Sequence, residues 1–419
     1  MNVLIKSATI VDVQSKHHNK KRDILITSGK IEKIAATIAN PDNRKEIKRD
    51  NLHVSQGWFD SSVSFGEPGF EDRETIKNGL KVAALSGFTS VALNPNTNPV
   101  IDSKADIEFV VSQAKGAATS LYPIGALTQG SKGIDLAELY DMKQAGATAF
   151  VDYQKSIENP NLLKLALQYT QGFNGLCIAF ANDTAISRNG VANEDVSATT
   201  LGLKGIPALA EELHIARNLF LLEYTGGKLH IPTVSTAKSV TLIKEAKKKG
   251  LNVSCSVAIH NLFLTDDALE RFDTNYKLLP PLRTESDRKA LLKGLKEGTI
   301  DGVTSDHNPI DVEHKKVEFD HALFGSIGLE SCFGMLQKHC TTEQAITYLT
   351  RLKDVFGVPT NTIAEGNKAA ISLFNPDETW TFTEDNIYSA SKNASALGQK
   401  LKGRVYGTYA NKKLTLNIY

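Results

Sequence analysis

Short apolar runs alternate with amphipathic stretches over most of this 419-residue chain, and this rhythm constrains its fold more than any other feature. From residue 57 onward, each apolar run of strand length, such as residues 89–94 (TSVALN), is accompanied by a helical stretch of roughly 10 to 15 residues. Strands and helices at this spacing form βα units on a parallel sheet, and about eight units close into a barrel. We therefore predict an α/β fold, with a (β/α)8 barrel of the TIM type over residues 56–365.

The two ends of the chain show a different pattern, in which apolar and polar residues alternate with a period of two. This alternation is clear in residues 2–13 (NVLIKSATIVDV) and 22–36 at the start, and in residues 369–375 and 404–419 at the end. It is typical of short antiparallel strands separated by turns. Because the two ends most simply pair with each other, we predict a small composite β-sandwich domain made of residues 1–55 and 366–419.

Charge and cysteine content narrow the class of partner. Lys and Arg number 48 against 47 Asp and Glu, so no global field attracts nucleic acid or an anionic membrane, and small molecules or proteins are the expected partners.

The four cysteines lie far apart without a CxxC pair, which argues against a disulfide framework or a structural zinc site. The first apolar runs are short and broken by charges, unlike a signal peptide or a membrane span. We expect a cytoplasmic protein.

The candidate site residues follow from the barrel, because the chemistry of a parallel barrel lies at the carboxyl ends of its strands. Residues 59–72 (FDSSVSFGEPGFED) form one such end, where an apolar run reaches a turn and presents serine hydroxyls. The other strand ends supply polar and charged side chains as well. The candidates are Ser62, Ser64, Asn94 to Asn98, Asp152, Phe180 to Asp183, His230 to Ser235, His260, Asp306 and His307.

Five segments in a fixed order carry a resemblance to a known family. They are residues 87–102 (GFTSVALNPNTNPVID), 201–251, 272–283 (FDTNYKLLPPLR), 298–309 (GTIDGVTSDHNP) and 389–405 (SASKNASALGQKLKGRV). Together they resemble the bacterial type I dihydroorotases of the amidohydrolase superfamily. The resemblance implies a (β/α)8 barrel with a composite β domain, and an enzyme that interconverts carbamoyl aspartate and dihydroorotate with one or two zinc ions. Zinc in such enzymes lowers the pKa of bound water to about 7.

The resemblance also implies where metal ligands would lie, and most of the ligand side chains are missing. The family's His-x-His falls on two serines, two further histidine positions fall on phenylalanine and threonine, and only two carboxylates remain. Neutral hydroxyls are poor zinc ligands and phenylalanine is none. We therefore expect no bound cofactor, and Asp306 is a candidate catalytic base only if the chain is active. The ligand positions are Ser62, Ser64, Asp152, Phe180, Thr233 and Asp306.

The substrate positions implied by the resemblance are partly retained. Asn96 and Asn275 match asparagines that contact substrate in the family, and we predict that they bind substrate. The arginine that pairs with the substrate carboxylate falls on Gly66, and the histidine of the family's APH segment falls on Ile310. Loss of a bidentate arginine pair removes a strong, directional interaction.

A metal site rebuilt from other residues is the alternative to a chain that binds no metal. His230 and His260 also end strands, and with Asp152 and Asp306 they are the side chains available to rebuild one. Buried histidines whose ring nitrogens are already bonded are the commoner case. We expect His230 to face away from the lost ligand position at Thr233, because side chains alternate along a strand. We also expect the Asp306–His307 pair to hydrogen-bond within the barrel mouth.

Three functional hypotheses remain open. The first is a catalytically inactive, dihydroorotase-like protein of pyrimidine biosynthesis that serves as a structural partner of aspartate carbamoyltransferase, as the resemblance implies. The second is an active cyclic-amide hydrolase with a rebuilt or relocated zinc site. The third is a sensor that binds a pyrimidine intermediate without turning it over. The resemblance makes a homodimer a further possibility, whereas neither nucleic acid nor a membrane is an expected partner.

Overall fold

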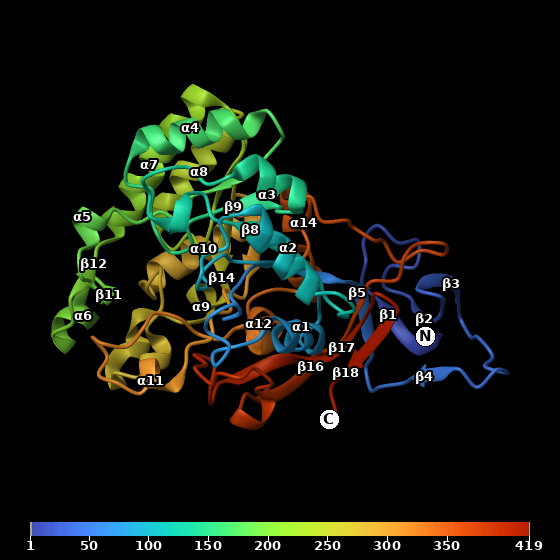
Figure 1. The fold of residues 1–419 in the computed structure, drawn as a ribbon. Coiled ribbons are helices and arrows are strands. Elements are labelled where there is room, and N and C mark those ends of the chain that lie inside the picture. The colour runs from blue at the N-terminus through green and yellow to red at the C-terminus, as the bar shows by residue number, and fades with distance from the viewer. Residues whose placement is uncertain (1, 419) are drawn as a thin grey trace.

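Eight parallel strands form the barrel of the computed structural model, which describes residues 2–418. Each strand lies beside the next barrel strand of the chain, and a parallel bridge between Val63 and His307 joins the segment after the last strand to the first. Figure 1 shows the barrel with its helices on one side and the strands from the two chain ends on the other. The predicted fold class, an α/β fold with a (β/α)8 barrel, is confirmed. The strands are β6 (Trp58–Val63), β7 (Phe88–Leu93), β8 (Ser120–Gly125), β9 (Ala149–Phe150), β10 (Cys177–Ile178), β13 (Leu229–Ile231), β14 (Val253–Ala258) and β15 (Gly302–Thr304).

Helices surround these strands, and side-chain caps mark where several of them begin. Thr75, Ser103, Thr236 and Thr284 each accept a hydrogen bond from a backbone N–H in the first helical turn. No helix between residues 2 and 418 is long and apolar enough to cross a lipid bilayer. The longer helices are α1 (Ile76–Leu85), α2 (Lys104–Gln113), α3 (Leu139–Ala145), α4 (Pro160–Gln171), α7 (Ala208–Thr225), α8 (Ala237–Lys248), α10 (Glu285–Glu297), α12 (Leu329–Leu336) and α13 (Thr342–Tyr348). The shorter ones are α5 (Thr184–Ser187), α6 (Val196–Leu201), α9 (Ile259–Phe263), α11 (Val312–Lys315) and α14 (Leu352–Phe356).

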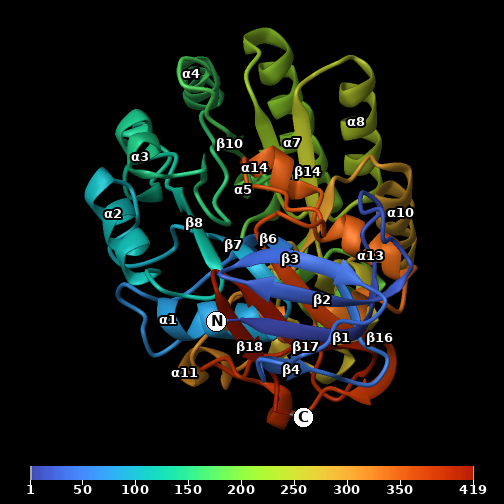
Figure 2. The ribbon, with the colours of Figure 1, turned by 90° about the vertical axis from the view of Figure 1, so that its right-hand side faces the viewer.

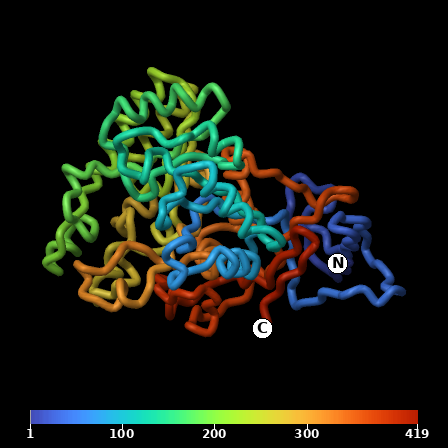
Figure 3. The backbone as a smooth tube through the Cα atoms, in the orientation of Figure 1, coloured from blue at the N-terminus to red at the C-terminus, as the bar shows by residue number. Residues whose placement is uncertain are grey.

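Both ends of the chain build a second sheet of eight strands (Figure 2). Its spatial order is β18, β17, β16, β5, β1, β2, β3, with β4 paired to β1. The antiparallel pair of β5 and β16 joins the start of the chain to its end, which run side by side in Figure 3. The division into domains at residues 55 and 366 stays a prediction. The strands are β1 (Val3–Ile10), β2 (Lys21–Thr27), β3 (Lys30–Ala35), β4 (Lys45–Ile47), β5 (His53–Gln56), β16 (Ile371–Thr381), β17 (Lys400–Ala410) and β18 (Lys413–Leu416).

Trp58, the first residue of β6, ties the barrel to this sheet. Its indole is fully buried and stacks on Phe333 of α12, with ring centroids 4.8 Å apart. It also packs against Phe374 of β16 at 5.6 Å. The indole N–H donates to the hydroxyl of Ser55 at 3.0 Å, so the one polar atom of the ring is satisfied. One aromatic cluster in the barrel core therefore holds β16 of the sheet against the barrel.

The substitution Trp58→Ala tests this junction. Removing a buried tryptophan leaves a cavity between α12 and β16, and we expect a loss of about 3 to 5 kcal/mol in the free energy of unfolding. Denaturant unfolding followed by circular dichroism measures it. Phe109→Ala, at a position on α2 that is 39% exposed, is the control and should cost clearly less than Trp58→Ala. Equal losses in the two variants would contradict the assigned role of Trp58.

Candidate functional site

A small cavity lies at the carboxyl ends of the barrel strands. Four of the ligand positions implied by the resemblance border it, namely Ser62, Phe180, Thr233 and Asp306. Its volume is about 20 Å³, room for about one water molecule, whereas small-molecule pockets measure roughly 300 to 1,000 Å³. The remaining lining residues are Ser61, Asn94, Val151, Tyr153, Gln154, Ile178, His230, Pro232 and Ser256.

Hydrogen-bonded side chains fill the space beside this cavity. The amide of Asn94 donates to the hydroxyl of Ser62 at 3.0 Å and to that of Ser64 at 3.3 Å. Ser62 in turn donates to Asp306 Oδ1 at 3.3 Å, and the Tyr153 hydroxyl donates to the same oxygen at 3.4 Å. The serines are therefore occupied by protein partners. Sequence reasoning included Asn94 among the strand ends but missed Tyr153, whose only signal was its place directly after Asp152.

The backbone at two of these positions adopts an uncommon conformation. Thr233 and Asp306 have φ angles of 46° and 47°, in the left-handed region that non-glycine residues enter infrequently. Each follows the end of a barrel strand, β13 and β15 respectively. Such strained positions persist only where the surrounding structure determines them, and they cluster at functional sites. The chain therefore keeps a backbone shaped to present side chains to this cavity.

Asp152 does not face the cavity with a free carboxylate. Its Oδ1 accepts hydrogen bonds from the backbone N–H groups of Leu127 and Thr128, both at 3.0 Å. Its Oδ2 accepts one from the hydroxyl of Thr128. Burial raises the pKa of this carboxyl, and the three hydrogen bonds oppose the shift. Asp152 holds the loop after β8, and both of its oxygens are engaged there.

Asp306 and Asp60 form a buried carboxylate pair with unequal surroundings. Asp60 accepts hydrogen bonds from the backbone N–H groups of Ser62 and Ser305 at 3.1 and 3.0 Å, and from the Thr304 hydroxyl. Burial and the nearby charge of Asp60 raise the pKa of Asp306 to about 7, although two hydroxyl donors oppose the shift. Because Asp60 has the better donors, the proton belongs on Asp306 when the pair carries one negative charge.

The three histidines near the strand ends are engaged in other contacts. His230 lies between the hydroxyls of Ser254 and Ser256, at 2.9 and 3.1 Å, and burial lowers its pKa to about 3. His260 Nδ1 lies 2.8 Å from the Ser395 hydroxyl. Through its Nδ1, His307 accepts from the backbone N–H groups at positions 328 and 329, and Asp306 accepts from Ser62 and Tyr153, so both residues of the pair are hydrogen-bonded, as expected.

The expected orientation of His230 is wrong. His230 and Thr233 border the same cavity. Side chains alternate only within a strand, but β13 ends at Ile231 and Thr233 has turned into a left-handed conformation. The rule of alternation therefore does not extend from one residue to the other.

The donors around the cavity do not fit zinc. Structural and catalytic zinc sites need at least three protein ligands of the Cys, His or carboxylate type in one place. Of these residue types only His230 and Asp306 line the cavity in the described part of the chain, and the His230 ring lies between the hydroxyls of Ser254 and Ser256. Among residues 2–418, no group of three or more His, Cys, Asp or Glu side chains is arranged to hold a metal ion. Nothing in this donor set therefore supports a zinc-bound hydroxide.

The two asparagines predicted to bind substrate do not line this cavity. Asn275 lies in the short turn Thr274–Tyr276 and borders a separate, open cleft of about 900 Å³. Asn96 lies in the loop after β7, and its Oδ1 is buried without a hydrogen-bond partner among residues 2–418. Their roles in substrate binding stay predictions. Gly66 sits in a turn so tight that any Cβ there would overlap the carbonyl oxygen of Phe70, so an arginine at this position requires the backbone to move.

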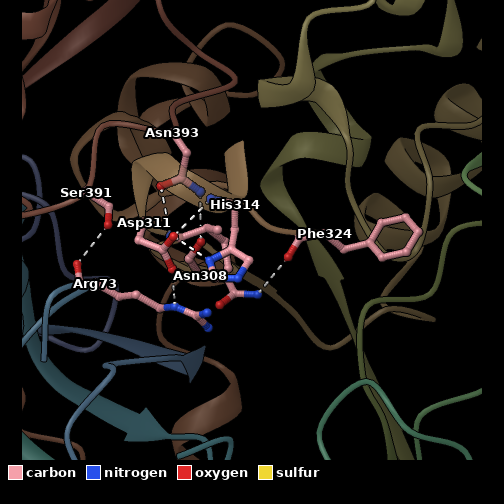
Figure 4. A network of polar contacts seen from close by, with 8 residues as sticks. Arg73, Asn308, Asp311, His314, Phe324, Ser391 and Asn393 are labelled. Atoms are coloured by element: carbon pink, nitrogen blue, oxygen red, sulfur yellow. Dashed lines mark hydrogen bonds and ion pairs between the residues drawn. The ribbon is translucent and has the colours of Figure 1, made fainter. Parts of the chain in front are cut away.

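An ion-pair network fixes the loop after β15 (Figure 4). Arg73 Nε donates to Asp311 Oδ2 at 2.8 Å, and His314 Nδ1 lies 2.5 Å from Asp311 Oδ1. Burial opposes the charge on Asp311, but the hydrogen bonds from His314 and Arg73 lower its pKa to about 2. Asn393 accepts from the Ile310 backbone N–H at 3.1 Å. The segments after β6 and β15 and the C-terminal segment around residue 393 are thus held as one unit.

The pKa of Asp306 predicts a pH dependence of stability. The folded pKa of about 7 lies above the ordinary value of 3.8, so the folded state binds the proton more tightly than the unfolded state. The bound proton on Asp306 therefore stabilises the folded state fully below pH 3.8. This stabilisation is lost, at about 1.4 kcal/mol per pH unit, as the pH rises from 3.8 towards 7.

We expect Asp306→Asn to remove this slope. Between about pH 5 and pH 7 the wild-type chain should lose about 2 kcal/mol more in unfolding free energy than the variant. Chemical denaturation of both proteins across this range measures the difference. Parallel stability curves would contradict a protonated Asp306.

The comparisons with known proteins agree with this architecture. The family described as Dihydro-orotase-like matches residues 53–239. A dihydroorotase of Pelotomaculum thermopropionicum is 40% identical over 99% of each chain, and one of Geobacter metallireducens is 37% identical over 99% of each. In fold, an L-hydantoinase of Arthrobacter aurescens aligns over 99% of this chain and 96% of its own, with a TM-score of 0.86 at 21% identity. A dihydropyrimidinase of Brevibacillus agri aligns over 100% and 95%, with a TM-score of 0.82 at 21% identity. Full-length similarity at this level, together with the barrel and its composite sheet, places this chain in the dihydroorotase family.

Proposed function

We propose that this chain is a catalytically inactive member of the dihydroorotase family, acting in pyrimidine biosynthesis as a cytoplasmic structural partner of aspartate carbamoyltransferase. One observation carries the inactive part of the proposal. Four of the six positions where the family holds zinc are occupied by hydroxyls or an aromatic ring, and the cavity beside them has room for about one water molecule. A metal-activated hydroxide has neither ligands nor space there.

The proposed role as a structural partner needs an intact fold but no active site. The barrel, its caps and the shared aromatic core around Trp58 are intact although the interior site lacks its ligands. A rigid outer surface is sufficient for a scaffold, because fold and function are separable properties of a chain. Aspartate carbamoyltransferase is the proposed partner because non-catalytic relatives in the resembled family associate with that enzyme.

A second candidate, an active cyclic-amide hydrolase, is favoured by one feature. Asp306 is buried beside the cavity, and burial with the charge of Asp60 raises its pKa to about 7, which is the range of an effective general base. This candidate requires the cavity to open, since it does not hold a molecule larger than water in the present conformation.

A turnover assay separates the two candidates. We expect the purified chain, with and without added zinc, to interconvert dihydroorotate and carbamoyl aspartate no faster than the buffer, because no metal hydroxide forms. An active dihydroorotase in the same assay is the positive control. Turnover that disappears in Asp306→Ala would establish the hydrolase instead. Calorimetric titration with dihydroorotate should give no binding heat, and a saturable signal without turnover would support the sensor hypothesis.

Association with aspartate carbamoyltransferase is tested separately. We expect the chain and the carbamoyltransferase of the same organism to sediment as one complex at micromolar concentration, and the carbamoyltransferase to lose stability when this chain is withheld. A carbamoyltransferase that is fully assembled and active alone, with no complex in the mixture, would contradict the structural role. Serum albumin in place of the carbamoyltransferase controls for non-specific association.

A further inference from the structure

A second cavity lies where the barrel meets the composite sheet, at the opposite end of the barrel from the site described above. It borders Gln56, which ends β5 two residues before β6 begins, whereas Ser62 lies near the other end of β6. Its volume is about 200 Å³, room for several water molecules or one small solute. Asp354 and Thr360 at its edge are exposed, so solutes reach it from the solvent. We call this cavity the junction pocket, and its polar side chains include Asp12, Gln56, Thr347, Thr350, Arg351 and Asp354.

The side-chain amide of Gln56 lies in the junction pocket without a partner for its oxygen. Gln56 is 9% exposed, and its Oε1 accepts no hydrogen bond from any group within residues 2–418. Buried polar atoms normally find partners, because an unpaired one has lost its hydration and gained no bond in return. The amide oxygen therefore marks a place for a bound molecule that donates to it.

Two carboxylates give the pocket a negative side. Asp12 is 3% exposed, and its oxygens accept from the backbone N–H groups of Gln14 at 3.1 Å and Ile363 at 2.8 Å. A carboxylate has about four acceptor sites, so Asp12 keeps sites for a further donor. Burial lowers the pKa of the Lys353 ammonium to about 8, and the charges of Asp12 and Asp354 oppose this shift, so both carboxylates lie near that one amine.

The threonines of the pocket add further acceptors. The hydroxyl of Thr347 donates to the carbonyl of Glu343 at 2.8 Å, and that of Thr350 donates to the carbonyl of Ile346 at 2.7 Å. Since each hydroxyl hydrogen is used within the helical segment, each oxygen keeps its lone pairs for a donor from the pocket.

Arg351 supplies the positive group of the pocket. Its guanidinium lies over the ring of Tyr348, 5.8 Å from the centroid, and makes no hydrogen bond or ion pair to the rest of the described chain. The ammonium of Lys353 does not line the pocket and is engaged, because it donates to the carbonyl of Gly57. The guanidinium offers several N–H donors in a planar fork, the geometry that matches a carboxylate.

These groups complement a molecule that carries both signs of charge. An ammonium group needs acceptors, which Gln56 Oε1, Asp12 and the threonine hydroxyls supply, whereas a carboxylate needs the donors of Arg351. A simple cation would leave the guanidinium unpaired, and a simple anion would leave the Gln56 oxygen unpaired beside two carboxylates. The small volume restricts the occupant to a short side chain, since pockets for larger ligands measure roughly 300 to 1,000 Å³.

We propose that the junction pocket binds a small zwitterionic amino acid, with its ammonium group at Gln56 and Asp12 and its carboxylate at Arg351. The pocket is separate from the cavity beside Asp306, and binding there involves this chain alone. The proposal is therefore independent of the role with aspartate carbamoyltransferase and is tested without that enzyme.

Calorimetric titration of the full-length chain with glycine, L-alanine and L-serine tests the proposal. We expect at least one of them to bind saturably with a Kd of about 1 mM or lower, and to raise the midpoint of thermal unfolding, because it binds only the folded state. Ethanolamine lacks the carboxylate of serine, and glycerate has a hydroxyl in place of its ammonium group. Both controls should bind at least about 10-fold more weakly than serine, and methylamine and acetate are the matching controls for glycine.

Two variants test the assigned contacts. Arg351→Gln removes the charged partner of the carboxylate and should weaken binding of the amino acid about 10-fold or more. Arg271→Gln, at an exposed position that does not line the pocket, is the matched control and should leave binding unchanged. Circular dichroism verifies that each variant is folded.

Gln56→Leu separates a ligand contact from a structural role. Leucine is close to glutamine in size but has no unpaired oxygen, so binding should weaken about 10-fold or more while the unfolding midpoint without ligand does not fall. A glutamine that only supports β5 would instead lower this midpoint when replaced. Absence of saturable binding by all three amino acids, equal binding of the single-charge controls, or binding that survives both Arg351→Gln and Gln56→Leu would each overturn the proposal.

Discussion

A buried carboxylate, Asp60, joins the first strand of the barrel to the last, and the site depends on this junction. Asp60 lies on β6 and accepts from Thr304 and Ser305 at the end of β15, while the backbone N–H of Ser64 donates to the carbonyl of His307 at 2.7 Å. Closing the barrel here brings the serine positions and Asp306 together although they are far apart in the sequence. The same closure places two carboxyl groups in a dry interior, which raises the pKa of Asp306 to about 7.

The side chains around the site offset the negative charge of the two buried carboxyl groups, Asp60 and Asp306. In a dihydroorotase with zinc, the metal offsets the carboxylates that face it. In this chain the raised pKa of Asp306 favours its neutral form, the hydroxyls of Ser62 and Tyr153 donate to its Oδ1, and the Asn94 amide donates to Ser62. These side chains are small or already bonded, so they complete the core without attracting a cation. The left-handed backbone at Asp306 persists because it belongs to the closure of the barrel as well as to the site.

The barrel was predictable from sequence because strand and helix periodicity is local, and each strand lies beside the next barrel strand of the chain. The site was predictable only in part. Ser62, Thr233 and Asp306, which lie at or after strand ends, border one cavity, but their hydrogen-bond partners depend on distant segments. His230 was misplaced because the strand stops two residues before Thr233, and Tyr153 was missed because no motif marks a tyrosine whose hydroxyl meets Asp306 across the barrel.

Elemental analysis for zinc tests the central claim most directly. The full chain would be produced in zinc-supplemented medium, purified without chelator, and measured beside an active dihydroorotase treated in the same way. The account predicts a zinc content near zero per chain, because hydroxyls or an aromatic ring stand at four of the six positions where ligands are needed. A content near one or two zinc ions per chain would contradict it, and would mean that Asp152, His230 or Asp306 leave their present partners to bind the metal.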